Sequence, residues 1–274
     1  MADSFLDTYA RQAEEIAREA GGILRERFGQ PHEVRFKGTI DMVTEADQAA
    51  EDLIASRLRL ACPDHDLLCE EGARGASGAS PFRWVVDPLD GTTNFAHGLP
   101  TFAVSIALEE LGEPVIGVVY DPMRDELFAS KRGHGATLNG VPIHISATET
   151  LIASILATGF SYDFERRAHQ AEIWRDFLTR VQAIRQTGSA ALNLCYIAAG
   201  RLDGYWERGI APWDVAAGAL MVLEAGGTVT DFCGEPFRSD DREVVASNRL
   251  LHDQLRNVIA RHHEPPLARP ELGD

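Results

Sequence analysis

The sequence contains one stretch in which an apolar run leads directly into acids and hydroxyls: Trp84-Val85-Val86-Asp87-Pro88-Leu89-Asp90-Gly91-Thr92-Thr93-Asn94-Phe95. Residues 82–86 carry aromatic and β-branched side chains, which predict a buried strand. We expect this strand to end at Asp87, where the side chain can leave the sheet. An apolar strand that ends on clustered polar groups is typical of a functional site.

The residues after the strand can bring oxygen atoms together. Pro88 fixes φ and Gly91 permits a sharp turn, so Asp87 and Asp90 can point into one small space. The carbonyl of Leu89, freed from strand pairing, can join them. Carboxylate and carbonyl oxygens are hard ligands that suit Mg²⁺, which binds oxygen at ~2.0–2.1 Å. The stretch therefore predicts a magnesium site.

Other interpretations of the stretch are weaker. Asp-Pro and Asp-Gly pairs are ordinary turn formers, but a turn does not need two acids. Two carboxylates about 4 Å apart would repel each other by about 4 kcal/mol at an effective dielectric constant of about 20, and the stretch holds no Lys or Arg. The haloacid dehalogenase type of phosphatase has an Asp-x-Asp pattern, whereas two residues separate Asp87 from Asp90 here. Bound cations explain the acids best.

The free backbone N–H groups of residues 91–93 can receive a phosphate where a helical turn starts. Together with the acids, they predict a site for metal and phosphate.

Length and composition indicate a globular protein of one or two domains. The chain has 274 residues, of which 45% are hydrophobic. Its net charge of −16 argues against nucleic acid or an anionic membrane as the main partner. No apolar run reaches the roughly 18 residues of a membrane span, and the N-terminus has no signal-peptide pattern. The four cysteines are scattered, as in a reducing compartment, and we expect a cytoplasmic chain.

The first half of the chain combines helices with an antiparallel sheet. Apolar spacing predicts a long amphipathic helix over 5–28 and a second helix that begins with the capping-box pattern of Thr44 and Asp47. From composition alone, Asp47 could be a cap or a functional acid. A short strand over 66–69 delivers Glu70 to a loop. Further strands are expected at 101–108, 115–120 and 126–130.

The character of the chain changes near residues 146–150, where strands begin to alternate with helices. Strands are expected at 152–158, 204–207, 228–232 and 244–247, and helices at 165–180, 189–199, 214–225 and 248–261. This pattern is typical of an α/β layer with sites at strand ends and helix N-termini. We expect two subdomains, 1–146 and 147–264, followed by a flexible tail over 265–274. The fold class is mixed α/β.

With these pieces in place, the chain resembles the inositol monophosphatase family over nearly its whole length. Three separate signatures carry the resemblance: the stretch 84–95, the segment Trp213-Asp214-Val215-Ala216-Ala217-Gly218, and Leu68-Cys69-Glu70-Glu71 preceded by Asp41-Met42-Val43-Thr44-Glu45-Ala46-Asp47. Departures are few. Cys69 stands where Gly is common and Gly72 where Ser is frequent, and neither supplies a ligand.

The resemblance implies a layered αβαβα sugar-phosphatase sandwich, a homodimer, two to three Mg²⁺ ions per site and sensitivity to lithium. The implied metal ligands are Glu70, Asp87, Leu89 (through its carbonyl), Asp90 and Asp214. The implied catalytic residues are Glu70, Thr92 and Asp47, with Asp47 supporting Thr92 as it orients the attacking water. The implied substrate-binding set is Glu70, Leu89, Asp90, Gly91, Thr92, Gly188, Ser189, Ala190, Glu207 and Asp214. Lys37 would lie in a mobile loop beside the metals.

The implied activity is Mg²⁺-dependent hydrolysis of myo-inositol 1-phosphate and related inositol monophosphates to inositol and phosphate. Clustered Mg²⁺ ions address the charge of the ester, because they activate water and neutralise the leaving oxygen. We expect Glu70 on the water side, Asp90 and Asp214 on the leaving-group side, and Asp87 between them. An acid at position 207 is typical of members that take inositol phosphates.

Alternatives remain at two levels. The same chemistry could act on histidinol phosphate, a sugar bisphosphate or a nucleotide 3′-phosphate. From another class, the protein could bind RNA or the transcription machinery, with phosphatase activity secondary. Only the arginines at 166, 167, 175 and 180 favour that second interpretation, and a solvated helix face explains them equally well.

Overall fold

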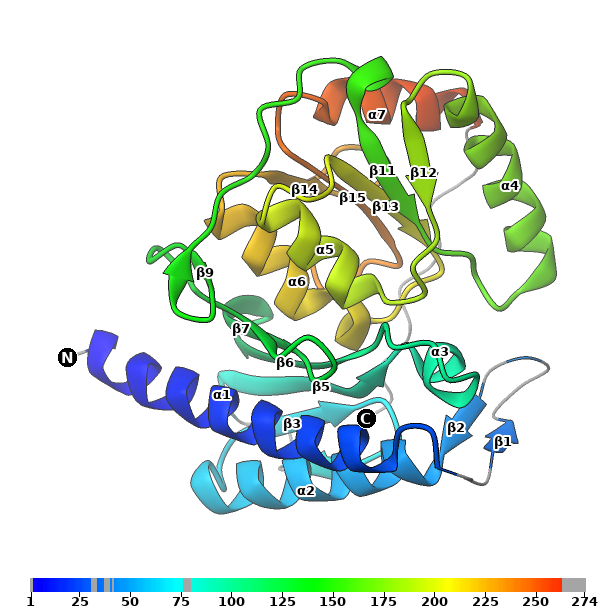
Figure 1. The fold of residues 1–274 in the computed structure, drawn as a ribbon. Helices are drawn as coiled ribbons and strands as arrows, with labels where there is room; N and C mark the ends of the chain where they lie inside the picture. Colours follow the sequence, from blue (N-terminus) through cyan, green and yellow to red (C-terminus); the bar gives the residue numbers. More distant parts are fainter. Residues whose placement is uncertain (1, 31–33, 37–39, 41, 76–79, 263–274) are drawn as a thin grey trace.

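Two β-sheets alternate with three layers of helices in the order α, β, α, β, α (Figure 1). The computed structural model describes residues 2–30, 34–36, 40, 42–75 and 80–262. The expectations for Lys37 and for the tail over 265–274 lie outside these residues. The layered sandwich and the mixed α/β class are confirmed.

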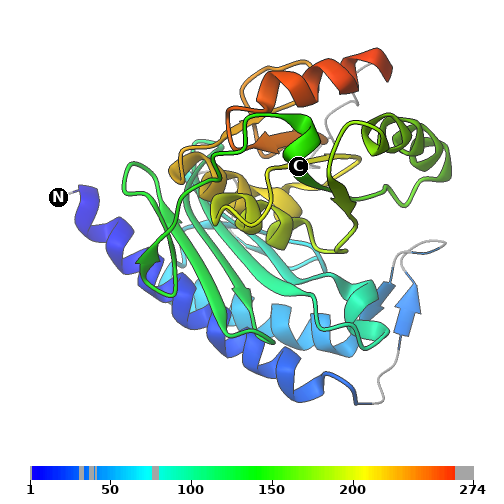
Figure 2. The ribbon, with the colours of Figure 1, turned by 45° about the horizontal axis from the view of Figure 1, so that its top comes forward.

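Seven α-helices occur in the described residues: α1 (Ala2–Arg27), α2 (Glu45–Ala61), α3 (Thr92–Ala96), α4 (Phe164–Leu178), α5 (Ala190–Ala198), α6 (Pro212–Glu224) and α7 (His252–Ile259). Two short 3₁₀ helices accompany them, η1 (Leu151–Ala153) and η2 (Ala260–His262). In Figures 1 and 2, α1 and α2 cover the outer face of one sheet, α5 and α6 fill the middle, and α4 and α7 cover the other sheet.

The larger sheet has eight strands in the order β10-β9-β8-β7-β6-β5-β3-β4. These strands are β3 (Asp66–Cys69), β4 (Arg74–Gly75), β5 (Phe82–Asp90), β6 (Ala103–Glu110), β7 (Glu113–Asp121), β8 (Glu126–Lys131), β9 (Ala136–Leu138) and β10 (Val141–Pro142). Only the β3–β5 pair is parallel, so Glu70 arrives beside the end of β5 from the same direction as the acids of β5.

The smaller sheet has five strands in the order β12-β11-β13-β15-β14. These strands are β11 (Ile155–Thr158), β12 (Ala183–Arg185), β13 (Gly204–Arg208), β14 (Thr228–Thr230) and β15 (Glu243–Ser247). β11 runs parallel to β12 and β13. A separate antiparallel pair is formed by β1 (Val34–Phe36) and β2 (Met42–Thr44).

Four apolar cores separate the five layers, and alternate residues of the central strands fall into different cores. On β5, Trp84 packs toward α1 and α2, whereas Val85 packs toward α5 and α6. On β13, Tyr205 packs toward α5 and α6, and Trp206 packs against α4 and α7. Strands that are covered on both faces read as continuous apolar runs, which is why their signal is strong in the sequence.

Side chains at the N-termini explain where several helices begin. Thr44 caps α2, and its hydroxyl accepts a hydrogen bond from the N–H of Ala46 at 3.1 Å. Asp163 caps α4 through the N–H groups of its first turn. Pro212 stands in the first turn of α6, where its missing N–H costs nothing.

Three predicted boundaries are wrong. β5 does not end at Val86 but continues to Asp90, because pairing with β6 resumes after a register shift between Asp87 and Asp90. The segment 152–158 is a 3₁₀ turn followed by a shorter strand. The last helix starts at His252 rather than at 248, since Arg249 has a φ of 69° that no helix tolerates. The division into two subdomains stays a prediction.

Candidate active site

The register shift in β5 sets the position of its two acids. Asp87 lies opposite Ser105 and Asp90 opposite Ala103, so the two residues between them are left out of the ladder. The N–H of Leu89 turns back and donates to Oδ1 of Asp87 at 2.9 Å. This arrangement frees the Leu89 carbonyl from strand pairing, as the sequence predicts.

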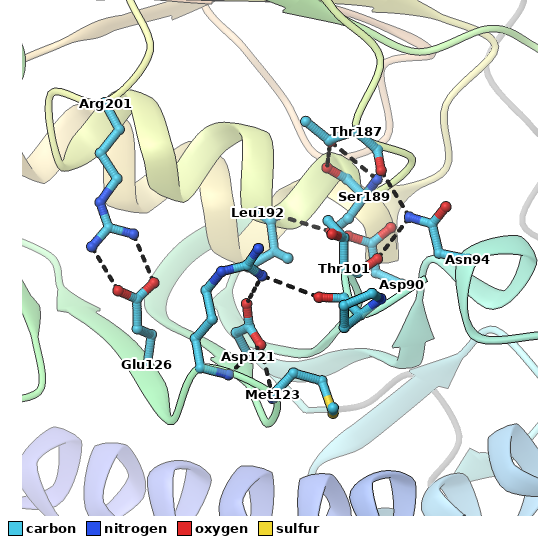
Figure 3. Close-up of polar contacts among 12 residues, drawn as sticks. Asp90, Asn94, Thr101, Asp121, Met123, Glu126, Thr187, Ser189, Leu192 and Arg201 are labelled. Carbon is cyan, nitrogen blue, oxygen red and sulfur yellow. Dashed lines mark hydrogen bonds and ion pairs between the residues drawn. The ribbon is translucent and has the colours of Figure 1, made fainter. Parts of the chain in front are cut away.

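Asp90 joins the larger sheet to the start of α5 (Figure 3). Its Oδ2 accepts hydrogen bonds from the Ser189 hydroxyl at 2.5 Å and the Ala191 N–H at 2.8 Å, and its Oδ1 accepts from the Ala190 N–H at 3.2 Å. The positive end of the helix stabilises a carboxylate at this position. Two of the residues predicted to hold substrate, Ser189 and Ala190, are therefore bonded to a predicted metal ligand.

Asn94 makes a second connection between the same two regions. Its side-chain nitrogen donates to the carbonyl of Thr101 at 2.7 Å and to the carbonyl of Thr187 at 2.7 Å (Figure 3). Gly188 lies against this amide with a φ of 84°, and a methyl group there would sit 2.7 Å from the Asn94 nitrogen. Glycine is therefore required where the chain passes Asn94 on its way into α5.

Asp47 is both a helix cap and a partner of Thr92. Its Oδ2 accepts from the N–H of Thr44 at 2.8 Å, which closes the capping box of α2. Its Oδ1 lies 2.9 Å from the hydroxyl oxygen of Thr92. The cap is confirmed, and it does not exclude the other interpretation, because a carboxylate has two oxygens. The functional role of Asp47 stays a prediction.

The Thr92 hydroxyl has one proton and two acceptors within reach, Asp47 at 2.9 Å and the Leu89 carbonyl at 3.1 Å. A hydroxyl donates one hydrogen bond and can accept two. When the hydroxyl donates its hydrogen bond to Asp47, the Leu89 carbonyl does not receive one from Thr92. The Thr92 oxygen can then accept a hydrogen bond from a ligand or a water. Gly91, the residue before, precedes the first turn of α3.

The remaining acids come from β3 and α6. The N–H of Glu70 donates to the Val86 carbonyl at 3.1 Å, which fixes Glu70 beside β5. Asp214 stands in the first turn of α6, and its Oδ2 accepts from the Ala211 N–H at 2.8 Å. The structure thus brings acids from three distant segments to one end of the larger sheet.

Burial and mutual repulsion act on these acids together. Burial raises the pKa of Asp87 well above its ordinary value, and the charges of Glu70, Asp90 and Asp214 raise it further. Burial raises the pKa of Asp90 to about 6, although its hydrogen bonds to Ser189 and α5 oppose the shift. Burial and the charges of Glu70 and Asp90 raise the pKa of Asp214. A divalent cation would relieve this repulsion.

The chemistry of the donor set fits a hard cation, since it consists of carboxylate oxygens and one carbonyl. Residues that could hold such an ion are Glu70, Asp87, Leu89, Asp90 and Asp214. Across residues 2–30, 34–36, 40, 42–75 and 80–262, no three His, Cys, Asp or Glu side chains already surround one point as metal ligands. Both oxygens of Asp90 accept hydrogen bonds from the start of α5.

Glu207 lies on β13, and its charge interacts with those of Asp90 and Asp214. The hydroxyl of Tyr205 donates a hydrogen bond to its Oε2. Burial raises the pKa of Glu207 to about 7, the Tyr205 hydrogen bond opposes this shift, and the charge of Asp90 adds to it. Glu207 can therefore take part in hydrogen bonding close enough to Asp90 to sense its charge.

Sequence reasoning missed the supporting residues Asn94, Tyr205 and Gly159. Strand alternation offered one signal, since Tyr205 and Glu207 are two residues apart and share a face of β13. No local pattern could show that Gly159 touches Glu207 or that Asn94 reaches Thr187.

Fold and site together are those of a phosphomonoesterase of the layered α/β class. Comparison with known proteins gives the family. The model of the inositol monophosphatase family matches residues 6–264, and the chain belongs to this family.

Similar proteins cover nearly the same length. An inositol-1-monophosphatase of Synechocystis is 43% identical over 94% of this chain and 90% of its own length. The Nus factor SuhB of Escherichia coli is 44% identical over 88% of this chain and 92% of its own length. The solved inositol monophosphatase of Anabaena (Nostoc) is 40% identical, with a TM-score of 0.85 over 96% of this chain and 98% of that chain.

Among the described residues, no helix is both long enough and apolar enough to span a bilayer.

Proposed function

We propose that this phosphomonoesterase hydrolyses inositol monophosphates, myo-inositol 1-phosphate among them, to inositol and phosphate, and that it requires Mg²⁺. One observation carries the proposal. At one end of the larger sheet, burial and the charges of Glu70, Asp90 and Asp214 raise the pKa of Asp87, and burial and the charge of Asp90 also raise the pKa of Glu207 on β13. The printed name of the Synechocystis relative supports the same substrate class.

Two to three Mg²⁺ ions held by Glu70, Asp87, the Leu89 carbonyl, Asp90 and Asp214 are the expected cofactors. When bound, magnesium supplies a Lewis acid that neutralises charge on the phosphate oxygens and lowers the pKa of water. Lithium would compete for one of these positions, and inhibition by millimolar Li⁺ is expected.

The protein's own groups orient the reactants. The Thr92 hydroxyl donates a hydrogen bond to Asp47, and this leaves the lone pairs of its oxygen directed toward the attacking water. We assign Glu70, which follows β3, to accept a proton from that water. This chain of contacts fixes the direction of attack without a covalent enzyme intermediate.

The polyol part of the substrate lies between the start of α5 and β13. Gly188 and Ser189 offer a close backbone approach, while the N–H of Ala190 is already engaged by Asp90. Glu207 accepts hydrogen bonds from ring hydroxyls. A homodimer, which the resemblance implies, stays a prediction.

A panel of phosphate esters with a Mg²⁺ titration tests the proposal. We expect the highest kcat/KM for inositol monophosphates and no turnover after chelation. A higher kcat/KM for histidinol phosphate, a sugar bisphosphate or a nucleotide 3′-phosphate would show that the enzyme prefers that substrate to inositol monophosphates. Turnover that persists in chelator would contradict the metal requirement.

A second function, binding to RNA or the transcription machinery, is favoured by the printed name of the Escherichia coli relative. In this chain, two of the four arginines of the α4 region form ion pairs: Arg175 with Glu172 and Arg180 with Asp176. Salt-sensitive binding of RNA by the purified protein would support this function. Absence of such binding at low salt would leave the phosphatase activity alone.

A further inference from the structure

Tyr205 is a buried phenol whose hydroxyl is directed at Glu207. Its side chain has no exposed surface and packs in the core between α5, α6 and the smaller sheet. Its hydroxyl donates to Oε2 of Glu207 from two residues away on the same face of β13. Trp206, between them, points to the opposite face and packs on Phe177 at 4.3 Å between ring centroids. Tyr205 therefore has little freedom to move its hydroxyl elsewhere.

The other oxygen of Glu207 is left for a ligand. Within the described residues, Oε1 of Glu207 receives no hydrogen bond, whereas Oε2 is taken by Tyr205. The Tyr205 hydrogen bond also lowers the pKa of Glu207 against the effect of burial, so it favours the ionised acceptor form.

Gly159 lies directly against the same carboxylate. A methyl group at Gly159 would overlap both oxygens and the carboxyl carbon of Glu207. The loop that carries Gly159 is fixed by Gln170, a buried amide that accepts from the Ser161 N–H at 2.8 Å and donates to the Arg208 carbonyl at 3.1 Å. The loop therefore cannot retreat without breaking buried hydrogen bonds.

We propose that Tyr205 and Gly159 are the positioning residues of Glu207, and that they fix Oε1 as the single acceptor offered to a ring hydroxyl of a polyol phosphate. The inference rests on the proposed function, because it assigns the polyol to Glu207. A carboxylate held in one orientation loses less entropy on binding, and it discriminates against esters that lack the matching hydroxyl. The contact explains how one acid could select substrates.

Tyr205→Phe tests the hydrogen bond. We expect kcat/KM for myo-inositol 1-phosphate to fall about tenfold, mainly through KM, and to fall much less for an aryl phosphate such as p-nitrophenyl phosphate. Tyr120→Phe is the matched control, since it removes a hydroxyl that donates to Asp125 at 2.9 Å on the larger sheet. Equal losses on both esters, or the same selectivity change in Tyr120→Phe, would overturn the assignment.

Gly159→Ala tests the space. We expect it to lower the ratio of inositol to aryl activity as much as Glu207→Ala does, and to add nothing in a Glu207→Ala background, where the overlapping carboxylate is gone. Gly22→Ala is the matched control, because a methyl group there meets no atom within 4 Å. A Gly159→Ala variant with wild-type selectivity, or additive losses in the double variant, would contradict the proposal.

A readout without substrate separates this inference from the proposed function. In protein labelled with ¹³C at the glutamate carboxyl carbon, the signal missing from Glu207→Gln identifies Glu207. That signal should shift in Tyr205→Phe and in Gly159→Ala, and stay in place in Tyr120→Phe. An unchanged signal in Tyr205→Phe would disprove the contact. If the wild type hydrolyses no polyol phosphate, the proposed function fails, and the positioning of Glu207 is decided by the carbon shift alone.

Discussion

The two sides of the candidate active site hold their acids in different ways. On the side of β3, β5 and α6, burial and the charges of Glu70, Asp90 and Asp214 raise the pKa of Asp87, and backbone N–H groups orient Asp87, Asp90 and Asp214. On the side of β13, a single acid is held by the hydroxyl of a tyrosine. The first side suits cations and the second suits hydroxyl groups. Chemistry and substrate choice are therefore expected to respond to different mutations.

The largest effect is expected from Asp90→Asn, which removes a charge from the first side. Turnover should fall by roughly 10³-fold or more, equivalent to about 4 kcal/mol of transition-state free energy. Asparagine also offers one acceptor oxygen in place of two, so the contact with α5 weakens. Ser189→Ala is the control, because it removes one of the same hydrogen bonds and leaves the charge. Near wild-type turnover in Asp90→Asn would remove Asp90 from the metal ligands.

Glu207→Gln sharpens the contrast from the other side. Loss of a charged hydrogen bond costs about 1.5–3 kcal/mol, so kcat/KM for myo-inositol 1-phosphate should fall roughly 10- to 150-fold. The Mg²⁺ concentration that gives half-maximal activity should change little. Steady-state kinetics on inositol and aryl phosphates measure both quantities. Equal losses on the two esters would make Glu207 a structural acid.

Thr92 and Asp47 are expected to act as one unit. Thr92→Ala should lower kcat by about 10- to 100-fold, the range seen when partners of metal-site groups are removed. The Asp47→Ala/Thr92→Ala double variant should lose no more than Asp47→Ala alone. Thr44→Ala is the control: it removes the helix cap, at about 0.5–2 kcal/mol of stability, and keeps the Thr92 contact. Additive losses in kcat would separate the two residues.

The smallest expected effect is a pH dependence of the free energy of unfolding, and it arises from Glu207 on β13. Burial raises the pKa of Glu207 from 4.5 to about 7, so the folded protein keeps its proton where the unfolded chain has lost it. The unfolded state then binds fewer protons, and stability falls as pH rises between about 4.5 and about 7. Relative to Glu207→Gln, the metal-free wild type should lose on the order of 2 kcal/mol across this window. Urea unfolding in chelator measures it, and parallel pH profiles would contradict it.

Much of the fold could be predicted because its central strands are covered on both faces. The residues 84–86 and 205–206 are apolar for that reason, and both predicted runs, 82–86 and 204–207, lie in strands. The capping box of Thr44 and Asp47 is confirmed as well. These features depend on residues that are close together in the sequence, so a local sequence pattern can predict them.

The rest depends on contacts between distant segments. Nothing local shows that β5 resumes pairing beyond Asp87, because that pairing belongs to β6. The strand β12 was not predicted. Its three residues are too few to show an alternation of apolar and polar side chains, and the strand is held in place by its pairing with β11. The joint role of Thr92 and Asp47 came from the resemblance to a family, and the hydrogen bond between them is visible only once the chain is folded. The metal ligands themselves stay a prediction.

The hydrogen bonds from the start of α5 to Asp90 also tie catalysis to assembly. They span 99 to 101 residues of the chain, and the Asn94 contact spans 93. Contacts of such long sequence separation close late, after the segments between them have ordered. A chain caught partway through folding can therefore hold both sheets and still lack the geometry of Asp90. Recovery of activity during refolding would report the docking of the smaller sheet and its helices onto β5, whereas recovery of helix content would not.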